Sequence, residues 1–525
     1  MTNDYRDNYY GSILDPLHGD IKLSEIEKWC ISHPLFSRLK KIKQNTFLYY
    51  VFPSANHTRF EHSIGVMHLA GKIFDSCKEN YATGQKKNEK HIITDKSVFF
   101  NLNQLGDREE IYFQELRLAA LLHDLGHGPL SHLFDEFAIS KNDFLKMIEK
   151  DKRLKNYKIG FEELIVENKN KVEHEIISCA FIFILIDELK RESIHNPNKF
   201  SDSAKRIVDG ISSERIVKLV EPNFPSLPDF LDNKGNVYTT FFSRIITAFP
   251  IDADRMDYLW RDSYFSGVTY GIYDSSRIFS SFLVTVRRKQ VYLCYKQSGL
   301  DSMLRFIQSR SHLYNQVYFH KTNRAANTML TYATQKNRLT KKKLINKHSI
   351  NSLIDFYVLN SDEYFLNNVK NKISTEKYEK EVSLELISRK LFKRIFEHKI
   401  VLTEKTFSLD VKIKNLQDKI DKKLLSLKKY GIYAVSDKYE NKTFKDSEKK
   451  PILIAVKNGK SYEFNSKWKN IGKEFELANL NVIMIRIYLR RTFLNSIEFE
   501  KFKLKILQAV NVEISALEKL IEKKI

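Results

Sequence analysis

The sequence predicts a mainly α-helical protein, in which a helical core is followed by a smaller, mixed α/β C-terminal lobe. Only 17 Gly and 10 Pro occur among 525 residues, which disfavours a barrel or sandwich built on many tight turns. Apolar residues instead recur at spacings of three and four over several long stretches, as on one face of a helix. Hydrophobic residues make up 42% of the chain, so a large core can be buried.

The first part of the chain predicts short elements followed by helices. Residues 1 to about 55 contain short elements around the segment Asp15-Pro16-Leu17-His18-Gly19. A helical stripe then runs through Phe60, Ile64, Met67 and Phe74. Helices are predicted over 59–77, 111–124, 172–190 and 240–262, and Gly126 and Gly128-Pro129 end the second of them. Two strands, 282–286 and 290–295, precede a long helix over roughly 299–334.

The composition changes near Thr340, where Lys341-Lys342-Lys343 opens a region rich in lysine and poor in glycine. Residues 380–430 have the pattern of a charged amphipathic helix. Residues 451–456 and 482–488 read as strands with a helix between them. We therefore divide the chain into a core over 1–335 and a lysine-rich, helical and mixed α/β lobe over 336–525.

Charge and cysteine usage limit the partners and the compartment. A net charge of +22 favours polyanions such as nucleotides or nucleic acid, although a lysine-rich surface without any ligand explains it equally well. The four cysteines are scattered and form no CxxC pair, which indicates a reducing compartment. The N-terminus is polar, and the most apolar run, Cys179–Ile186, is far shorter than the ~18 residues of a membrane span. We expect a cytoplasmic protein without membrane association.

Three short motifs supply metal-ligand residue types. They are Arg59-Phe60-Glu61-His62, the stretch His123 to His132, and the stretch Ile251 to Tyr258, which contains Asp254. Two imidazoles and two carboxylates suit a divalent metal that keeps positions open for water and phosphate. Adjacent residues on a helix point about 100° apart, so His123 and Asp124 can reach one ion only near a helix end. The glycines that follow fit that placement.

More histidines are present than a single metal requires. His127 and His132 follow the His123-Asp124 pair, and His174 lies further along. Histidine titrates near neutral pH, so the surplus can donate to phosphate or act as a general acid. A carboxylate such as Asp135 would hold a neighbouring imidazole in its charged form.

These residues resemble the HD-domain deoxynucleoside triphosphohydrolases, namely the bacterial dGTP hydrolases and the vertebrate antiviral enzyme that carries a sterile alpha motif before its HD domain. The match is close over 49–53, 59–63, 123–132 and 251–258, and weaker over 310–321 and 484–488. The resemblance implies an HD-domain helical core and hydrolysis of a dNTP to deoxynucleoside and inorganic triphosphate. It also implies a divalent ion (Mn, Fe, Zn or Mg), Mg²⁺ with the triphosphate, and a homo-oligomer.

The resemblance further implies roles for individual residues. The metal ligands would be His62, His123, Asp124 and Asp254, and catalysis would involve His132, Asp135 and His127. Arg59, His174, Arg255 and Arg310 would hold the triphosphate, Gln44 and Asp262 the 3′-hydroxyl, and Tyr258 and Tyr318 would exclude a 2′-hydroxyl. Arg277, His320 and Lys321 match basic family positions near subunit junctions, where a nucleotide would act as effector.

Other interpretations remain open at this stage. The site could serve an HD phosphodiesterase or nuclease that acts on cyclic or linear oligonucleotides, or be vestigial in a basic nucleic-acid-binding assembly. Tyr258 and Tyr318 could be core aromatics, and Arg310, Arg277, His320 and Lys321 could be solvated surface charges. Asn45 and Phe319 depart from the vertebrate enzyme where the base is bound, and Ser32, Ser37 and Lys40 depart at its activator site. Either antiviral depletion or balancing of dNTP pools would fit this activity.

Overall fold

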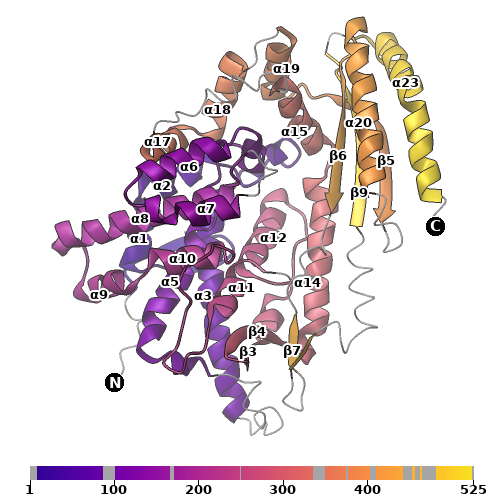
Figure 1. The fold of residues 1–525 in the computed structure, drawn as a ribbon. Coiled ribbons are helices and arrows are strands. Elements are labelled where there is room, and N and C mark those ends of the chain that lie inside the picture. The colour runs from indigo at the N-terminus through magenta and orange to yellow at the C-terminus, as the bar shows by residue number, and fades with distance from the viewer. Residues whose placement is uncertain are drawn as a thin grey trace.

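The computed structural model describes residues 9–86, 101–165, 171–248, 250–334, 349–373, 377–402, 410–441, 452–455, 461–463, 481–492 and 494–522. Helices dominate these ranges, and three small sheets accompany them (Figure 1). The mainly α fold class with a mixed C-terminal part is therefore confirmed. Within the described ranges, no helix is both long and apolar enough to cross a membrane.

The N-terminal half consists of a hairpin followed by helices. The hairpin pairs β1 (Ser12–Asp15) with β2 (Gly19–Lys22). The helices that follow are α1 (Glu25–Ser32), α2 (Pro34–Ser37), α3 (Arg59–Lys86), α5 (Glu109–Leu122), α6 (Lys141–Lys150), α7 (Lys158–Leu164), α8 (His174–His195), α9 (Asp202–Gly210), α10 (Ser213–Val220), α11 (Thr239–Ile246) and α12 (Ala253–Ser266). Every residue of α8 from Ile176 to Ile186 is buried, as expected for a helix that is apolar on all sides.

The second half combines helices with two further sheets. Its helices are α13 (Ser275–Phe279), α14 (Leu300–Leu313), α15 (Lys321–Thr334), α17 (Ile350–Leu359), α18 (Asp362–Asn368), α19 (Lys377–Ile387), α20 (Asp410–Leu427) and α23 (Ser496–Glu522). One sheet has the order β3-β4-β7-β8, formed by Phe282–Arg287, Gln290–Lys296, Leu453–Ala455 and Ser461–Glu463. The other has the order β5-β9-β6, formed by Lys393–Leu402, Asn481–Leu489 and Ala434–Asn441.

Three of the predicted elements are wrong. The helix expected over 240–262 is two helices, because Pro250 cannot continue a helix and Asp252 caps α12 by accepting from the Arg255 amide at 2.7 Å. The helix expected over 299–334 ends in a π-helical turn over Tyr314–Tyr318, and α15 begins anew at Lys321. The charged helix expected over 380–430 contains β5. The lysine run 341–343 and most of the helix expected between 456 and 482 lie outside the described residues.

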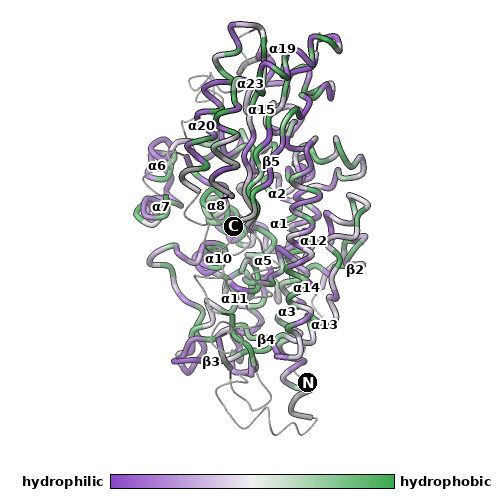
Figure 2. Tube along the Cα trace, turned by 90° about the vertical axis from the view of Figure 1, so that its right-hand side faces the viewer, coloured by the Kyte–Doolittle hydropathy of each residue, from purple (hydrophilic) through white to green (hydrophobic). Residues whose placement is uncertain are grey.

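The main apolar core extends past residue 335. Leu353, Tyr357 and Phe365 of α17 and α18 belong to the same buried cluster as the helices of the N-terminal half. The β5-β9-β6 sheet instead packs one face against α20 and α23 in a separate cluster that includes Ile487 and Ile506. Figure 2 shows green, hydrophobic stretches along α8 inside the molecule and purple, hydrophilic ones along α6 and α7 at its edge. The division of the chain at 335 stays a prediction.

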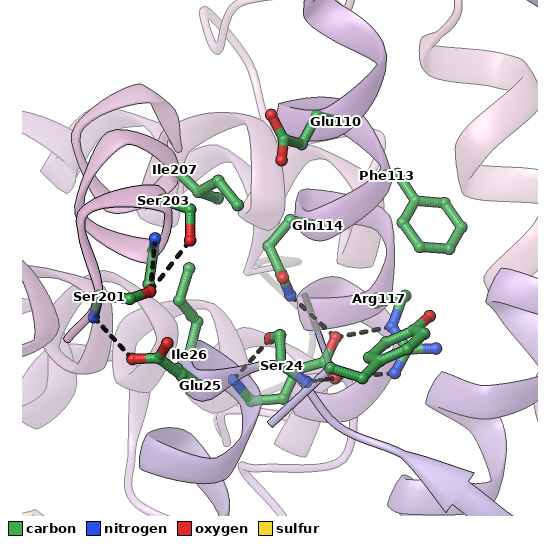
Figure 3. Close-up of a pocket in the computed structure, with 13 residues that line it drawn as sticks. Ser24, Glu25, Ile26, Glu110, Phe113, Gln114, Arg117, Ser201, Ser203 and Ile207 are labelled. Atoms are coloured by element: carbon green, nitrogen blue, oxygen red, sulfur yellow. Dashed lines mark hydrogen bonds and ion pairs between the residues drawn. The ribbon is translucent and has the colours of Figure 1, made fainter. Parts of the chain in front are cut away.

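A buried ion pair joins α1 to α5. Glu27, fully buried, accepts from Arg117 Nε at 2.6 Å and from Gln114 Nε2 at 2.9 Å. Burial alone would raise the pKa of Glu27, but the charge and hydrogen bonds of Arg117 hold it below its usual value. Figure 3 shows Gln114 and Arg117 pointing toward the first turn of α1, beside a small cavity.

Glu27→Ala should strongly destabilise the fold, because it leaves the Arg117 guanidinium buried without its carboxylate. Breaking a buried pair in this way costs about 3–5 kcal/mol. Thermal and urea unfolding measure the effect. Glu25→Ala on the same helix is the control, since Glu25 is partly exposed and accepts a hydrogen bond from the Ser201 amide rather than from a buried cation. Equal melting temperatures of the Glu27→Ala and Glu25→Ala variants would contradict a stabilising role for the Glu27–Arg117 pair.

Candidate active site and metal centre

The four predicted metal ligands come from three helix ends that meet. His62 lies in the first turn of α3, and Asp254 lies in the first turn of α12. The helix α5 ends at Leu122, so His123 is its C-cap residue and Asp124 follows in the turn. As the sequence predicted, this pair sits at a helix end, where the two side chains can turn toward one point.

The distances within this cluster fit a divalent ion. His62 Nε2 lies 3.1 Å from Asp254 Oδ1 and 3.7 Å from Asp124 Oδ2. His123 Nε2 lies 3.4 Å from Asp124 Oδ1 and 3.8 Å from Asp254 Oδ1. Both Nε2 atoms are buried and make no hydrogen bond within the described part of the chain. Two unpartnered imidazole nitrogens that face two carboxylates are a donor set that suits a divalent metal.

The charges of the ligands also suit a cation. Burial would raise the pKa of Asp124, but Arg59, His123 and His127 hold it well below its usual value, so the carboxylate is ionised. Arg59 Nη1 donates directly to Asp124 Oδ2. Burial would lower the pKa of His62, but the carboxylates of Asp254 and Asp257, one at each edge of the ring, raise it to about 10. A metal that binds here therefore displaces a proton from His62.

A strained turn connects the cluster to the neighbouring histidines. Leu130 and Ser131 have φ angles of 66° and 53°, in the left-handed region that side chains rarely adopt. The turn is held by Asp362 of α18, whose Oδ1 accepts from the Leu130 amide at 2.7 Å, and by Thr46, whose hydroxyl donates to the Leu130 carbonyl at 2.7 Å. Such strain persists only where the surroundings fix it, and it is frequent at functional sites.

His127, His132 and His174 form a second histidine group. The rings of His127 and His174 stack with centroids 3.6 Å apart, and His132 meets both rings edge-on. Asp135 Oδ1 lies 3.7 Å from His174 Nδ1. Burial would lower the pKa of His174, but Asp135 and Glu175 raise it, whereas enclosure and the charges of Arg59 and His174 lower the pKa of His132 despite its exposed edge. The imidazole whose pKa is raised beside Asp135 is thus that of His174.

One cavity of about 500 Å³ brings nearly all the predicted site residues together. Three of the four metal ligands line it, and His62 lies buried directly behind them. The other predicted residues on its wall are His127, His132, His174, Gln44, Arg59, Arg255, Tyr258, Asp262, Arg310 and Tyr318. Asp135 is not on the wall but contacts it through His174. The predicted residues on the wall therefore converge from six stretches of the chain, at 44, 59, 123–132, 174, 254–262 and 310–318.

The aromatic wall is held by specific hydrogen bonds. Arg310 Nε donates to the Tyr258 hydroxyl at 3.0 Å, and the Tyr318 hydroxyl donates to Asp262. His57 Nε2 lies 2.7 Å from the other oxygen of Asp262. Tyr258 and Tyr318 pack against the apolar core and also line the cavity, and Arg310 lines it beside them.

Several residues at the pocket were not predicted from the sequence. Tyr314 lies on the wall, and its spacing of four from both Arg310 and Tyr318 was an available signal. Asn323, Arg324 and Asn327 of α15 also line the cavity, and α15 begins only after the interruption at Phe319. A continuous helix was expected there, so no signal pointed to them.

The C-terminal sheet supports this side of the pocket. The Phe319 ring packs on Tyr439 of β6 with centroids 3.9 Å apart, and Arg486 of β9 donates to the Phe319 carbonyl at 2.6 Å. Asp437 of β6 forms an ion pair with Arg324 at 2.5 Å. The wall formed by Phe319 and α15 therefore depends on strands more than a hundred residues away.

The predicted effector residues lie outside the pocket. Arg277 of α13 is exposed and donates to the Ser298 carbonyl at 2.7 Å. His320 precedes α15, and Lys321 begins it. Lys321 lines a separate cavity of about 440 Å³ together with Lys393, Arg394 and Arg491. The positive charges on the wall of this cavity suit an anion. The cavity is separate from the one that contains the metal cluster.

Comparison with known proteins agrees with the geometry. Residues 59–192 match the HD domain, and residues 277–429 match the HD associated region. The chain is 28% identical over 405 residues to an uncharacterized protein of Methanocaldococcus jannaschii, covering 75% of this chain and 66% of the relative. It is 28% identical over 326 residues to the deoxynucleoside triphosphate triphosphohydrolase SAMHD1 of Xenopus laevis, covering 61% of this chain and 44% of the relative. The matches thus span under two thirds of these relatives' own lengths.

Proposed function

Because this chain belongs to the HD-domain family of hydrolases, we propose that it converts deoxynucleoside triphosphates to deoxynucleoside and inorganic triphosphate. The observation that carries the proposal is the cavity that joins the metal cluster to four arginines and three tyrosines. The arginines offer charge to a triphosphate, and the tyrosines offer a flat wall to a sugar.

We assign metal binding, charge neutralisation and proton transfer to different residues around the cavity. His62, His123, Asp124 and Asp254 would hold a divalent ion, which supplies Lewis-acid polarisation of the phosphoryl oxygens. Arg59, Arg255 and Arg310 neutralise the triphosphate and the charge that develops at the α-phosphorus, and His127 donates a hydrogen bond there. Water adds to that phosphorus, the bond to the 5′-oxygen breaks, and this oxygen takes up a proton. His132 is the proposed proton donor, the pair of His174 and Asp135 beside it resupplies that proton, and the proton released by the attacking water returns to this pair.

The opposite end of the cavity would bind the nucleoside. Gln44 Oε1 is buried and has no hydrogen-bond partner within the described residues, so it can accept from a 3′-hydroxyl near Asp262. Asn45 Nδ2 and Asn327 Oδ1 are likewise buried and unpartnered in the described ranges. This donor and this acceptor face the cavity and can read the edge of a base.

A second candidate function is supported by the group of His127, His132 and His174. Their ligand atoms lie within 4.8 Å of one another, so the group could hold a second metal ion. Two metals would favour an HD phosphodiesterase acting on cyclic or linear oligonucleotides. Incubating the protein with each dNTP, a cyclic dinucleotide and single-stranded DNA, in Mn²⁺ and in Mg²⁺, separates the two functions. Turnover of the oligonucleotides alone would establish the second.

We also propose that nucleotides bind at subunit junctions and promote assembly. A net charge of +22 repels like chains unless anions lie between them, and Arg277, His320 and Lys321 are the proposed contacts. A nucleotide that favours the assembled form binds that form more tightly. Adding an effector nucleotide should raise the molecular mass and increase the hydrolysis rate about 5- to 150-fold, the usual range of such coupling.

Light scattering and hydrolysis of a labelled substrate, measured together, test this proposal. Lys321→Glu should weaken both responses. Lys146→Glu, an exposed lysine on α6, should leave both unchanged. If neither the molecular mass nor the hydrolysis rate changes with any added nucleotide, the proposal is contradicted and the hydrolase is unregulated.

A further inference from the structure

The segment Asp15-Pro16-Leu17-His18-Gly19 has no role in the function proposed so far, yet it lies behind the metal cluster. It forms the turn between β1 and β2, where Asp15 Oδ1 accepts from the Leu17 amide at 2.9 Å and the His18 amide at 3.0 Å. Gly19 ends the turn with a φ of 69°, which glycine adopts without strain. The turn directs the His18 ring inward, where its Nε2 lies 2.7 Å from Asp257 Oδ1.

Asp257 connects this turn to His62. It lies three residues after Asp254 on α12, so the two carboxylates project from the same side of the helix. Asp254 faces His62 Nε2, whereas Asp257 Oδ2 lies 2.8 Å from His62 Nδ1 on the other edge of the ring. The side chains of Asp257 and His62 are 0% and 1% exposed, so water does not compete for these contacts.

Arg261 completes the group and links it again to the turn. Its Nε donates to Asp257 Oδ2 at 2.8 Å and its Nη2 to Asp257 Oδ1 at 2.9 Å. Its Nη1 donates to Asp15 Oδ2 at 2.9 Å. The turn therefore contributes two side chains, Asp15 through Arg261 and His18 directly, that fix one buried carboxylate.

The helix that carries His62 leaves room for this carboxylate. Gly65 lies three residues after His62 on α3, and a Cβ there would stand 2.0 Å from Asp257 Oδ1. No side chain can occupy that position while Asp257 stays in place. The glycine, the carboxylate and the imidazole thus form one fitted unit.

We propose that Asp257, held by His18 and Arg261, is a positioning residue that orients His62 with Nδ1 protonated and Nε2 free for the metal. Imidazoles that bind metals usually donate their other ring N–H to a carboxylate, which fixes the tautomer and the ring angle. This inference rests on the proposed metal-dependent function, because it assigns the Asp15–Gly19 turn to support of that metal site.

The test is Mn²⁺ affinity of the full chain by calorimetry, without nucleotide. Asp257→Asn keeps the side-chain shape but can donate an amide N–H to His62 and so stabilise the wrong tautomer. We expect its affinity to fall about 10- to 100-fold, the usual effect of losing such a partner. Asp202→Asn, an exposed aspartate on α9, should bind like wild type. A folded Asp257→Asn variant with wild-type affinity overturns the proposal.

If Asp257→Asn does not fold, a pair of variants at His18 tests the positioning role of Asp257 instead. His18→Gln retains an N–H that can reach Asp257, whereas His18→Ala does not. Weaker Mn²⁺ binding by the alanine variant, with recovery in the glutamine variant, supports the positioning role. Wild-type affinity in both overturns it. Failure of the wild-type chain to bind Mn²⁺ contradicts the proposed function itself and is thereby distinguishable.

Discussion

His123→Gln and Asp124→Asn should each lower the rate of dNTP hydrolysis at least about a thousandfold. A bound metal supplies several kcal/mol of transition-state stabilisation, and each 1.36 kcal/mol corresponds to a factor of ten in rate. His123 sits at the end of α5, and among the described residues its ring makes one hydrogen bond, to the Ala120 carbonyl. Its replacement therefore removes a ligand without removing core volume. Steady-state rates and metal analysis of the purified variants measure both consequences.

The controls separate loss of metal from loss of structure. His195→Gln changes an exposed histidine on α8 whose ring contacts the Arg191 carbonyl, and it should retain activity and metal. Asparagine at 124 can still accept from Arg59, so the buried guanidinium keeps a partner. Circular dichroism and melting of the two ligand variants should resemble wild type. A variant carrying both His123→Gln and Asp124→Asn that retained its bound metal and its activity would contradict the assignment of these residues as metal ligands.

Wild-type protein should hydrolyse dNTPs about a hundredfold faster than the matching ribonucleotides. A closed wall that rejects one added hydroxyl achieves discrimination of about this size. Tyr258 and Tyr318 would form that wall, and Tyr318 is held in place by its bond to Asp262. Tyr318→Ala should open the wall and reduce the preference for dNTPs over ribonucleotides to below about tenfold. Without the Tyr318 ring, a 2′-hydroxyl no longer meets a steric barrier. Rates with dATP and ATP, measured side by side, give the ratio.

Tyr318→Phe is the matched control for this experiment. It keeps the ring against the sugar and removes only the hydroxyl that donates to Asp262. We expect a lower rate on both nucleotides but a preserved ratio, because the steric wall remains. Equal rates on ATP and dATP in the wild type would favour a phosphodiesterase or a general nucleotidase.

The candidate ligands could be found from sequence because they lie in three short local motifs. Gly126 and Gly128-Pro129 end α5 beside His123-Asp124, as predicted. The cap of α12 at Asp252 was not predicted, because Asp254 lay within a single helix expected over 240–262. The contributions of His57 and Asp257 could not be found this way, since each acts only through a side chain that tertiary packing brings to it.

The errors in the fold have a related cause. The strand β5 has a charged, helix-like sequence, but its pairing with β9 runs from Lys393↔Leu489 to Leu402↔Asn481, about ninety residues apart. Long-range pairing overrides local preference in such a segment. The interruption of the helix after Tyr318 is not marked by a proline or glycine in the sequence. It exists because Phe319 packs on Tyr439 and accepts from Arg486, contacts that no local pattern encodes.

Hydrolysis of a dNTP in isotopically labelled water, with every product identified, tests the central claim most directly. Attack at the α-phosphorus with cleavage of the bond to the 5′-oxygen yields deoxynucleoside and inorganic triphosphate in equal amounts. The labelled oxygen should then appear in the triphosphate and be absent from the deoxynucleoside. Release of deoxynucleoside monophosphate with pyrophosphate, of diphosphate with phosphate, or label in the deoxynucleoside would contradict the proposed reaction.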